Sequence, residues 1–241
     1  MTISTIVHKS NPLRVIVAWG VHLFTATGAV WGLLSILAIF EGDYKMMIVW
    51  IIVAILVDSF DGMLARWADV KKYASGIDGA LLDNIIDYLN YVLVPAFFLI
   101  QSDILPAPVR LLAACSILLT SAYQLTQTDA KTADNYFKGF PSYWNVLALY
   151  MLLMGLPQWV NFGLLMACNV LVFVPVKYIY PSRNRVMRHL TLALTYLYAA
   201  IGVWALLQYP DQPGWVVWVS FVYVAYYLAL SLMPKNKVHA H

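Results

Sequence analysis

The sequence predicts an all-α fold: a polytopic membrane helix bundle of about eight transmembrane helices with both termini in the cytoplasm. Its 241 residues are 62% hydrophobic and only 11% charged, with a mean hydropathy of +0.72. Soluble domains carry about 25% charged residues, and a soluble chain of this size could not bury so many apolar side chains. Apolar runs recur along the whole chain without an internal repeat, so residues 1–241 are interpreted as a single integral membrane domain.

Eight apolar segments are candidates for membrane-spanning helices, which need about 20 mainly apolar residues each. They cover residues 15–40, 46–67, 80–101, 109–127, 142–156, 159–179, 188–208 and 214–233. Clusters of proline and polar residues separate them. The first is longer than the roughly 7–15 residues of a signal-peptide core, so we expect it to remain as a helix. The fifth is short, and the count falls below eight if that segment is re-entrant or packed inside the bundle.

The basic residues indicate how these segments are oriented. With the N-terminus in the cytoplasm, 13 of the 15 lysines and arginines fall on the cytoplasmic side, in agreement with the positive-inside rule. Those 13 are Lys9, Arg14, Arg66, Lys71, Lys72, Lys131, Lys138, Lys177, Arg183, Arg185, Arg188, Lys235 and Lys237. Only Lys45 and Arg110 fall on the outer side. No basic run is interleaved with aromatic residues, so we expect no nucleic-acid partner.

Four aspartates lie inside the second and third segments. Asp58 and Asp61 are spaced i, i+3, and Asp83 and Asp87 are spaced i, i+4, so each pair occupies one helix face. At 1.5 Å per residue, Asp58 lies roughly 19 Å and Asp87 about 22 Å from the outer ends of their helices. Asp61 and Asp83 lie deeper, at roughly 24 and 28 Å. Antiparallel neighbouring helices would therefore bring the four carboxylates together in the cytoplasmic half of the membrane.

Clustered carboxylates need a counter-charge, because without one they repel each other and take up protons. Mn²⁺ or Mg²⁺ would serve, since hard divalent cations prefer carboxylate oxygens and commonly bind phosphate as well. No histidine or cysteine lies near the aspartates in the sequence, which disfavours zinc or copper. Alternatively, the aspartates only cap helices or pair with Arg66 and Lys71. Intramembrane carboxylates are usually functional, so we predict a metal site formed by all four.

Residues with little or no side chain flank the acidic positions. Gly62 and Ala65 follow the first aspartate pair by one helical turn, and Gly79 precedes the second pair by one turn. Such positions leave room for a bulky ligand against the helix backbone. Arg66, which is next to Ala65, can bind phosphate in a forked geometry.

Together, residues 58 to 87 spell D-x2-D-G-x2-A-R-x12-G-x3-D-x3-D. This pattern resembles the signature of the CDP-alcohol phosphotransferases, integral membrane enzymes that make phospholipids by displacing CMP from a CDP-linked donor. The twelve residues between Arg66 and Gly79 are more than most of the family has. This longer stretch is similar to that of the bacterial phosphatidylcholine synthase subfamily. The same resemblance extends to three further runs, LVDSFDG, DNIIDYLNYVLVPAF and FKGFPSYWN. The resemblance covers most of the chain.

The resemblance implies a reaction, a cofactor and roles for the motif residues. CDP-diacylglycerol and choline would give phosphatidylcholine and CMP with the help of Mn²⁺ or Mg²⁺. The enzyme would be a homodimer in the lipid bilayer of the bacterial inner membrane, with its active site on the cytoplasmic side. The resemblance also implies that Asp87 is the catalytic base, although spacing alone does not distinguish it from Asp83. The residues implied to bind CDP-diacylglycerol are Asp58, Gly62, Ala65, Arg66 and Gly79.

Choline would be recognised by aromatic rings, because a quaternary ammonium binds their faces. Tyr91 lies one turn after Asp87, with Tyr88 and Asn84 nearby, and Trp144 enters the membrane in the run GFPSYWN. Tyr91, Trp144, Tyr88 and Asn84 are therefore the predicted choline contacts. Further candidates are Tyr123, Phe140, Tyr143 and Asn145. Most other aromatic residues are expected in the interfacial belts.

Alternatives remain open at this point. An enzyme of the same family could use serine, glycerol phosphate or inositol phosphate, but a phosphorylated acceptor would need a basic pocket rather than an aromatic one. A transporter for choline or a divalent metal would also contain intramembrane aspartates, although transporters often show internal repeats and broken helices. Arg183, Arg185 and Arg188 either reflect the positive-inside bias or hold a donor phosphate or anionic lipid.

Overall fold

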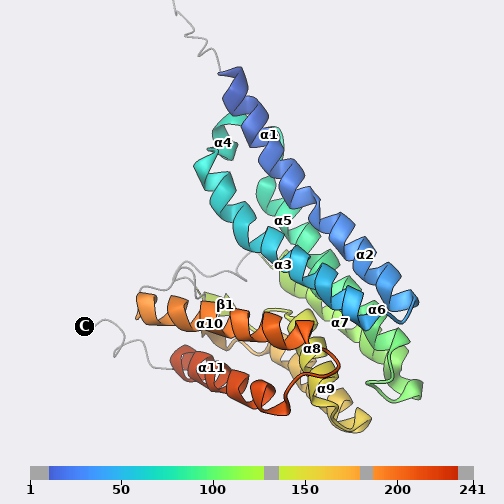
Figure 1. The fold of residues 1–241 in the computed structure, drawn as a ribbon. Helices are drawn as coiled ribbons and strands as arrows, with labels where there is room; N and C mark the ends of the chain where they lie inside the picture. The colour runs from blue at the N-terminus through green and yellow to red at the C-terminus, as the bar shows by residue number, and fades with distance from the viewer. Residues whose placement is uncertain (1–10, 128–135, 180–186, 233–241) are drawn as a thin grey trace, which may run out of the picture.

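The computed structural model describes residues 11–127, 136–179 and 187–232 (Figure 1). Its helices are α1 (Pro12–Ala26), α2 (Gly28–Phe40), α3 (Tyr44–Trp67), α4 (Val70–Tyr73), α5 (Gly79–Tyr88), the π-helical turn η1 (Leu89–Leu93), α6 (Val94–Gln101), the 3₁₀ turn η2 (Ala107–Val109), α7 (Arg110–Thr126), α8 (Trp144–Met154), α9 (Gln158–Phe173), α10 (Arg188–Leu207) and α11 (Gly214–Leu232). The predicted all-α membrane fold is confirmed, with one small addition. Two short strands, β1 (Tyr136–Lys138) and β2 (Lys177–Ile179), pair antiparallel.

Six stretches of the described residues are long and apolar enough to cross a membrane: Pro12–Phe40, Tyr44–Trp67, Gly79–Gln101, Ala107–Thr126, His189–Leu207 and Gly214–Ser231. The apolar helices α8 and α9 are shorter, with 11 and 16 residues, or about 17 and 24 Å. The predicted span 159–179 is too long: Pro175 favours extended backbone at Val174, so α9 ends at Phe173 and the chain continues into β2. The count of eight crossings stays a prediction, as does the side of the two termini, which lie outside the described residues.

The first predicted span forms two helices that run end to end and are interrupted at Thr27. The hydroxyl of Thr27 donates a hydrogen bond to the Phe24 carbonyl oxygen at 2.6 Å, and such back-bonding bends helices. The span begins at Pro12, which suits the first helical turn, after Asn11, whose side chain accepts a hydrogen bond from the Leu13 amide at 3.1 Å.

The two helices that carry the aspartates both begin at capping aspartates. The Asp43 carboxylate accepts a hydrogen bond from the Met46 amide at 2.9 Å, and α3 then runs without interruption for 24 residues. The Asp78 carboxylate accepts from the amides of Ala80 and Leu81 at 3.0 and 3.1 Å at the start of α5. These bonds satisfy amides that the first turn of a helix leaves without partners.

The third predicted span is not a regular α-helix throughout. The π-helical turn η1 separates α5 from α6 just before Pro95, which has no amide hydrogen to donate to the preceding turn. The side-chain amide of Asn90 donates to the carbonyl oxygens of Ile86 and of Gly28 on α2, both at 3.1 Å. Such turns are frequent at functional sites, and this one directly follows the helix that carries the second aspartate pair.

Two glycines allow α2 to pack closely against α5 and η1. A Cβ atom added to Gly28 would collide with Cγ2 of Ile86, and one added to Gly32 would lie 2.9 Å from Oδ1 of Asn90. Glycines four residues apart are typical of closely packed membrane helices, because they let two backbones approach each other. This contact, together with the Asn90 hydrogen bonds, holds α5 in place.

Three apolar clusters fill the interior of the bundle. The first surrounds Trp144 and joins α6, α7, α8 and α9, and the second surrounds Phe98 and joins α2, α3, α6 and α8. The third surrounds Val70 and joins α1, α4 and the end of α3. Through this third cluster, the stretch between Arg66 and Gly79 packs against α1 beside the start of α5.

The last two helices pack against each other and lie at an angle to the bundle formed by α1–α7 (Figure 1). Hydroxyl groups connect them to α8 and to each other. Tyr150 Oη lies 2.6 Å from Ser220 Oγ and 3.1 Å from Tyr198 Oη, and Thr195 Oγ1 lies 2.7 Å from Tyr223 Oη. Between membrane helices such hydrogen bonds add to the van der Waals packing, since lipid gives no hydrophobic driving force for association.

Replacing Gly28 by alanine should destabilise the bundle, because the added methyl group would overlap Ile86 where α2 meets α5. Overpacking of this kind costs about 1–3 kcal/mol. Gly20→Ala is the matched control, since the space around Gly20 on α1 is open and alanine is the better helix former. Thermal unfolding in detergent should give a lower Tm for Gly28→Ala and an equal or higher Tm for Gly20→Ala. Equal Tm values for both variants would contradict the close contact described above.

Candidate active site

Three of the four intramembrane aspartates converge between α3 and α5. Carboxylate oxygens of Asp58, Asp83 and Asp87 all lie within 4.8 Å of one another, and each of these side chains is half-buried. The three aspartates lie at matching depths, and the two on α5 share one helix face. Because α3 and α5 both pack against α1, the two helices lie close enough for these side chains to meet. The fold therefore assembles three acidic groups inside a membrane-spanning bundle.

Asp61 lies beside this group rather than in it. Its side chain is only 8% exposed and lies near Asp58 and Asp83, against the hydroxyl of Thr25 on α1. The four-aspartate metal site predicted from the sequence thus has three members whose oxygens are close together and a fourth that is adjacent. Metal ligation by Asp61 stays a prediction.

The converging groups fit a hard divalent cation. All the potential ligand atoms of Asp58, Asp83 and Asp87 are carboxylate oxygens, which suit Mg²⁺ or Mn²⁺ better than Zn²⁺ or Cu²⁺. Three carboxylates at this distance repel one another, and a bound cation would remove the repulsion. The residues present therefore agree with the metal that the sequence motif implies.

The face of α3 beside the aspartates is open at one position. A Cβ atom added to Gly62 would meet only Nη1 of Arg66, at 3.5 Å. The Arg66 side chain thus folds back along α3 over Gly62, where its guanidinium can meet a phosphate. Ala65, in contrast, is partly buried by the cluster between α1 and α4. Of the two small residues on α3, Gly62 gives the more open approach to the backbone.

Gly79 has a neighbour that the sequence analysis did not anticipate. A Cβ atom at this position would lie 3.2 Å from Cε1 of His22 on α1, so an imidazole ring occupies the space that was expected to receive a ligand. In the sequence no histidine lies near the aspartates, but in the fold the ring of His22 lies over Gly79, one helical turn before Asp83. The available signal was a pair of polar residues, His22 and Thr25, spaced i, i+3 inside an apolar segment.

Tyr91 contacts the acidic group through its hydroxyl. Its Oη atom donates a hydrogen bond to Oδ2 of Asp58 at 2.7 Å, and Tyr91 also lies near Asp87 and Tyr143. The spacing on the helix correctly placed Tyr91 beside the aspartates, but it did not predict the bond to α3. Tyr143, just before α8, adds a second and more exposed aromatic side chain.

The other candidates for the acceptor site are placed less favourably. Trp144 is 1% exposed, and its Nε1 donates to Ser121 Oγ at 2.6 Å, so neither face of its ring is open in this structure. Tyr88 donates its hydroxyl to a backbone carbonyl of α7 at 3.0 Å. Asn84 is half-buried on α5. Tyr123 lines a separate hollow of about 220 Å³ at the end of α7.

Two of the three arginines considered for phosphate or lipid binding, Arg183 and Arg185, lie outside the described residues. Arg188 is the first residue of α10. The structure thus leaves the proposed role of this basic segment untested.

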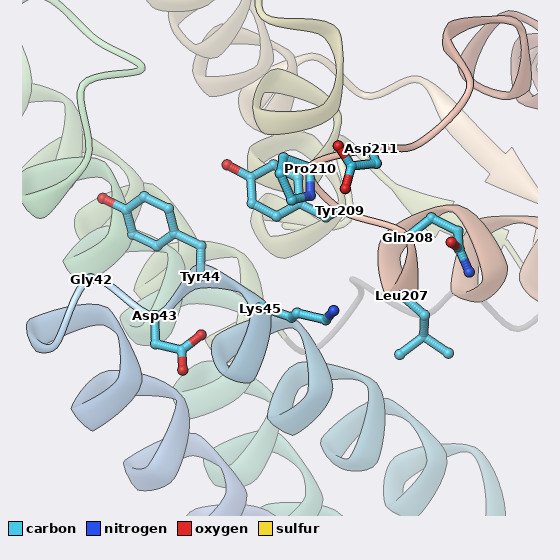
Figure 2. Close-up of a pocket in the computed structure, with 9 residues that line it drawn as sticks. All are labelled: Gly42, Asp43, Tyr44, Lys45, Leu207, Gln208, Tyr209, Pro210 and Asp211. Atoms are coloured by element: carbon cyan, nitrogen blue, oxygen red, sulfur yellow. The ribbon is translucent and has the colours of Figure 1, made fainter.

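A larger hollow, of about 410 Å³, lies at the opposite end of the bundle (Figure 2). The loop between α2 and α3 and the loop between α10 and α11 line it, with Tyr44, Lys45 and Tyr209 among its residues. Lys45 precedes Asp58 by 13 residues on α3, or about 20 Å along the helix. The hollow is therefore remote from the carboxylates, and it is their chemistry rather than the size of a cavity that marks the functional site.

A family model for the CDP-alcohol phosphatidyltransferases matches residues 21–176, which contain all the aspartates and their neighbours described above. The phosphatidylcholine synthase of Legionella pneumophila is 43% identical over 237 residues, covering 93% of each chain. That of Borreliella burgdorferi is 39% identical and covers 79% of this chain and 82% of its own. That of Pseudomonas aeruginosa is 35% identical and covers 92% and 93%. With its motif, fold and these similarities in agreement, the chain belongs to the CDP-alcohol phosphatidyltransferase family.

Proposed function

We propose that this chain is a phosphatidylcholine synthase, which transfers the phosphatidyl group of CDP-diacylglycerol to choline and releases CMP. The observation that carries the proposal is the acidic group of Asp58, Asp83 and Asp87 with Tyr91 hydrogen-bonded to it. The family supplies the reaction class, and the proteins named above as phosphatidylcholine synthases match nearly the whole chain. An aromatic ring beside carboxylates is an environment that favours a cationic acceptor.

The donor binds along α3 and the start of α5. A Mn²⁺ or Mg²⁺ ion held by Asp58, Asp83 and Asp87, with Asp61 adjacent, would neutralise charge on the donor diphosphate and on the departing CMP. Gly62 admits the donor to the backbone of α3, and Arg66 binds a donor phosphate there. Direct contact of the donor with Ala65 and Gly79 stays a prediction, because Ala65 packs against the cluster between α1 and α4 and the ring of His22 covers Gly79.

The acceptor binds on the side of Tyr91. Its ring, with Tyr143 nearby, contacts the quaternary ammonium, and the choline hydroxyl points toward Asp87. Asp87 takes the proton of the choline hydroxyl. The choline oxygen forms a bond to the phosphatidyl phosphorus, and the bond from this phosphorus to the CMP oxygen breaks. Asp87 has this role by its place in the family motif, and its closeness to Tyr91 is consistent with it.

The alternative readings fit these observations less well. A phosphorylated acceptor would bring further negative charge next to the carboxylates, whereas choline brings a positive charge. A transporter would not explain the similarity of the chain to synthases along almost its full length. The proposal also places the site at the cytoplasmic side of a bacterial inner membrane, in a homodimer. The basic residues at the end where α1, α3 and α4 meet, Arg14, Arg66, Lys71 and Lys72, support that orientation.

Purified protein should release CMP from CDP-diacylglycerol only with choline and a divalent metal, forming one phosphatidylcholine per CMP. EDTA should stop the reaction, and Mn²⁺ or Mg²⁺ but not Zn²⁺ should restore it, because the ligands are oxygens. Serine, glycerol phosphate and inositol phosphate serve as competing acceptors in the same assay. A preference for one of them would show that the acceptor assignment is wrong, and choline uptake into vesicles without CMP release would indicate a transporter.

Replacing Asp83 by asparagine should reduce turnover by about 100-fold or more, because a charged carboxylate becomes a neutral amide at a site that must stabilise the leaving group. Mn²⁺ affinity, measured by titration in detergent, should fall as well, while the Tm stays close to that of the unchanged protein. Asp103→Asn is the control, since the carboxylate of Asp103 is exposed, lies outside the acidic group and pairs with Arg110 at 2.6 Å. Wild-type Mn²⁺ affinity in a well-folded Asp83→Asn variant would remove Asp83 from the ligand set.

Two substitutions of Tyr91 should separate its ring from its hydroxyl. Tyr91→Phe keeps the ring but loses the bond to Asp58, so kcat and Mn²⁺ affinity should fall while the KM for choline changes little. Tyr91→Ala also loses the ring, and the KM for choline should rise by roughly 2- to 30-fold, the value of one cation–π contact. Tyr196→Ala, at an exposed position on α10, is the control. If Tyr91→Ala retains the wild-type choline KM, another residue binds the ammonium group.

A further inference from the structure

His22 is a polar side chain buried inside the membrane segment α1. It is 6% exposed, and its Nε2 atom is shielded from solvent and has no hydrogen-bond partner among the described residues. Buried polar atoms in folded proteins are nearly always paired, because leaving one unpaired costs free energy. This nitrogen therefore needs a partner that the described part of the chain does not provide.

His22 lies close to the candidate active site. Its Cε1 atom packs over Gly79, where a Cβ would lie only 3.2 Å away, and the ring of Trp19 contacts it edge-on, with the centroids 6.4 Å apart. One turn along the same face of α1, Thr25 contacts Asp61. The imidazole therefore sits one helical turn from the carboxylates, on the side of the start of α5.

The chemistry of the donor indicates which part of it lies near His22. The acyl chains of a CDP-linked lipid stay in the membrane, and its diphosphate belongs at the acidic group. The nucleoside then extends toward the end of the bundle where α5 begins and where the basic residues lie. A neutral imidazole offers one donor and one acceptor nitrogen, and both a cytosine base and a ribose can pair with either.

We propose that Nε2 of His22 hydrogen-bonds the nucleoside part of the CDP-linked donor, and that Gly79 lacks a side chain because this ring must pack against its backbone. This inference rests on the proposed function, since it assumes a nucleotide-linked lipid as the donor. It assigns a substrate contact to α1, outside the aspartate motif. His22 acts by binding rather than by transferring a proton or ligating the metal.

The test measures CMP and pyrophosphate binding to the full-length protein in detergent with saturating Mn²⁺. His22→Phe keeps a ring of similar shape without its nitrogens, so CMP affinity should fall by about 2- to 12-fold, the effect of one hydrogen bond. Pyrophosphate affinity should not change. His22→Gln, whose amide nitrogen can reach the position of Nε2, should recover part of the lost affinity. His189→Phe is the control, because His189 is exposed at the start of α10.

Each outcome decides the inference. In the transfer assay, His22→Phe should raise the KM for CDP-diacylglycerol and leave the KM for choline unchanged. A purely structural role would leave CMP affinity at the wild-type value in a variant of normal Tm, and that result would overturn the inference. Equal loss of CMP and pyrophosphate affinity would also overturn it, since the contact would then be with phosphate. If the protein binds CMP but makes no phosphatidylcholine, only the proposed acceptor is refuted. The CMP affinities of the unchanged protein and of the His22 variants would still test the contact with His22.

A double-mutant cycle provides a second measurement if His22→Phe folds poorly. Gly79→Ala should weaken CMP binding in the unchanged background, because its methyl group would push the imidazole by a few tenths of an ångström. In the background of His22→Ala, the same substitution should have a smaller effect, since the ring is gone. Additive effects of the two substitutions on CMP affinity would show that Gly79 and His22 act independently and would contradict the proposal.

Discussion

The close approach of α2 to α5 is the constraint on which the active site depends. Charged groups inside a membrane are tolerated only when they face one another or a bound partner, so the two aspartate-bearing helices must be held at a fixed separation. α2 packs against both α3 and the helix that continues α5. Gly28 makes that contact possible, and Asn90 hydrogen-bonds across it. A larger side chain at Gly28 would move Asp83 and Asp87 away from Asp58 without touching any of them.

The sequence could predict which aspartates share a helix face and a depth, because these two properties depend on local helix geometry. Asp58 on α3 and Asp83 and Asp87 on α5 lie on unbroken helices, so rise and periodicity set their depth and face. The carboxylate oxygens of three of the four predicted aspartates therefore converge. The structure differs from the sequence-based predictions where a proline ends a helix or where residues distant in the sequence pack together. Pro175 ends α9 earlier than hydropathy suggests, and His22 meets Gly79 only through packing of α1 on α5.

Aromatic residues show why composition alone could not locate the acceptor site. Trp144 and Tyr91 both lie beside the active-site helices, and both were predicted to contact choline. Their polar atoms distinguish them: Trp144 donates to Ser121 within the packed core, whereas Tyr91 donates to Asp58, a member of the acidic group. Only the hydrogen-bond partner distinguishes an aromatic residue that fills the core from one that contacts the acidic group.

If His22 and Tyr91 have the proposed roles, the three binding levels follow one another along α5 and into η1. His22 packs at Gly79, the carboxylates follow four and eight residues later, and Tyr91 comes four residues after Asp87, each four-residue step being about 6 Å of helix. In an in-line displacement, the attacking and departing oxygens lie on opposite sides of the phosphorus. A nucleoside at the level of His22 and an ammonium group at the level of Tyr91 would place CMP and choline on opposite sides of a phosphate held at the aspartates. The four-residue spacing from Gly79 through α5 into η1 would thus order the nucleoside, the diphosphate and the acceptor along one membrane span.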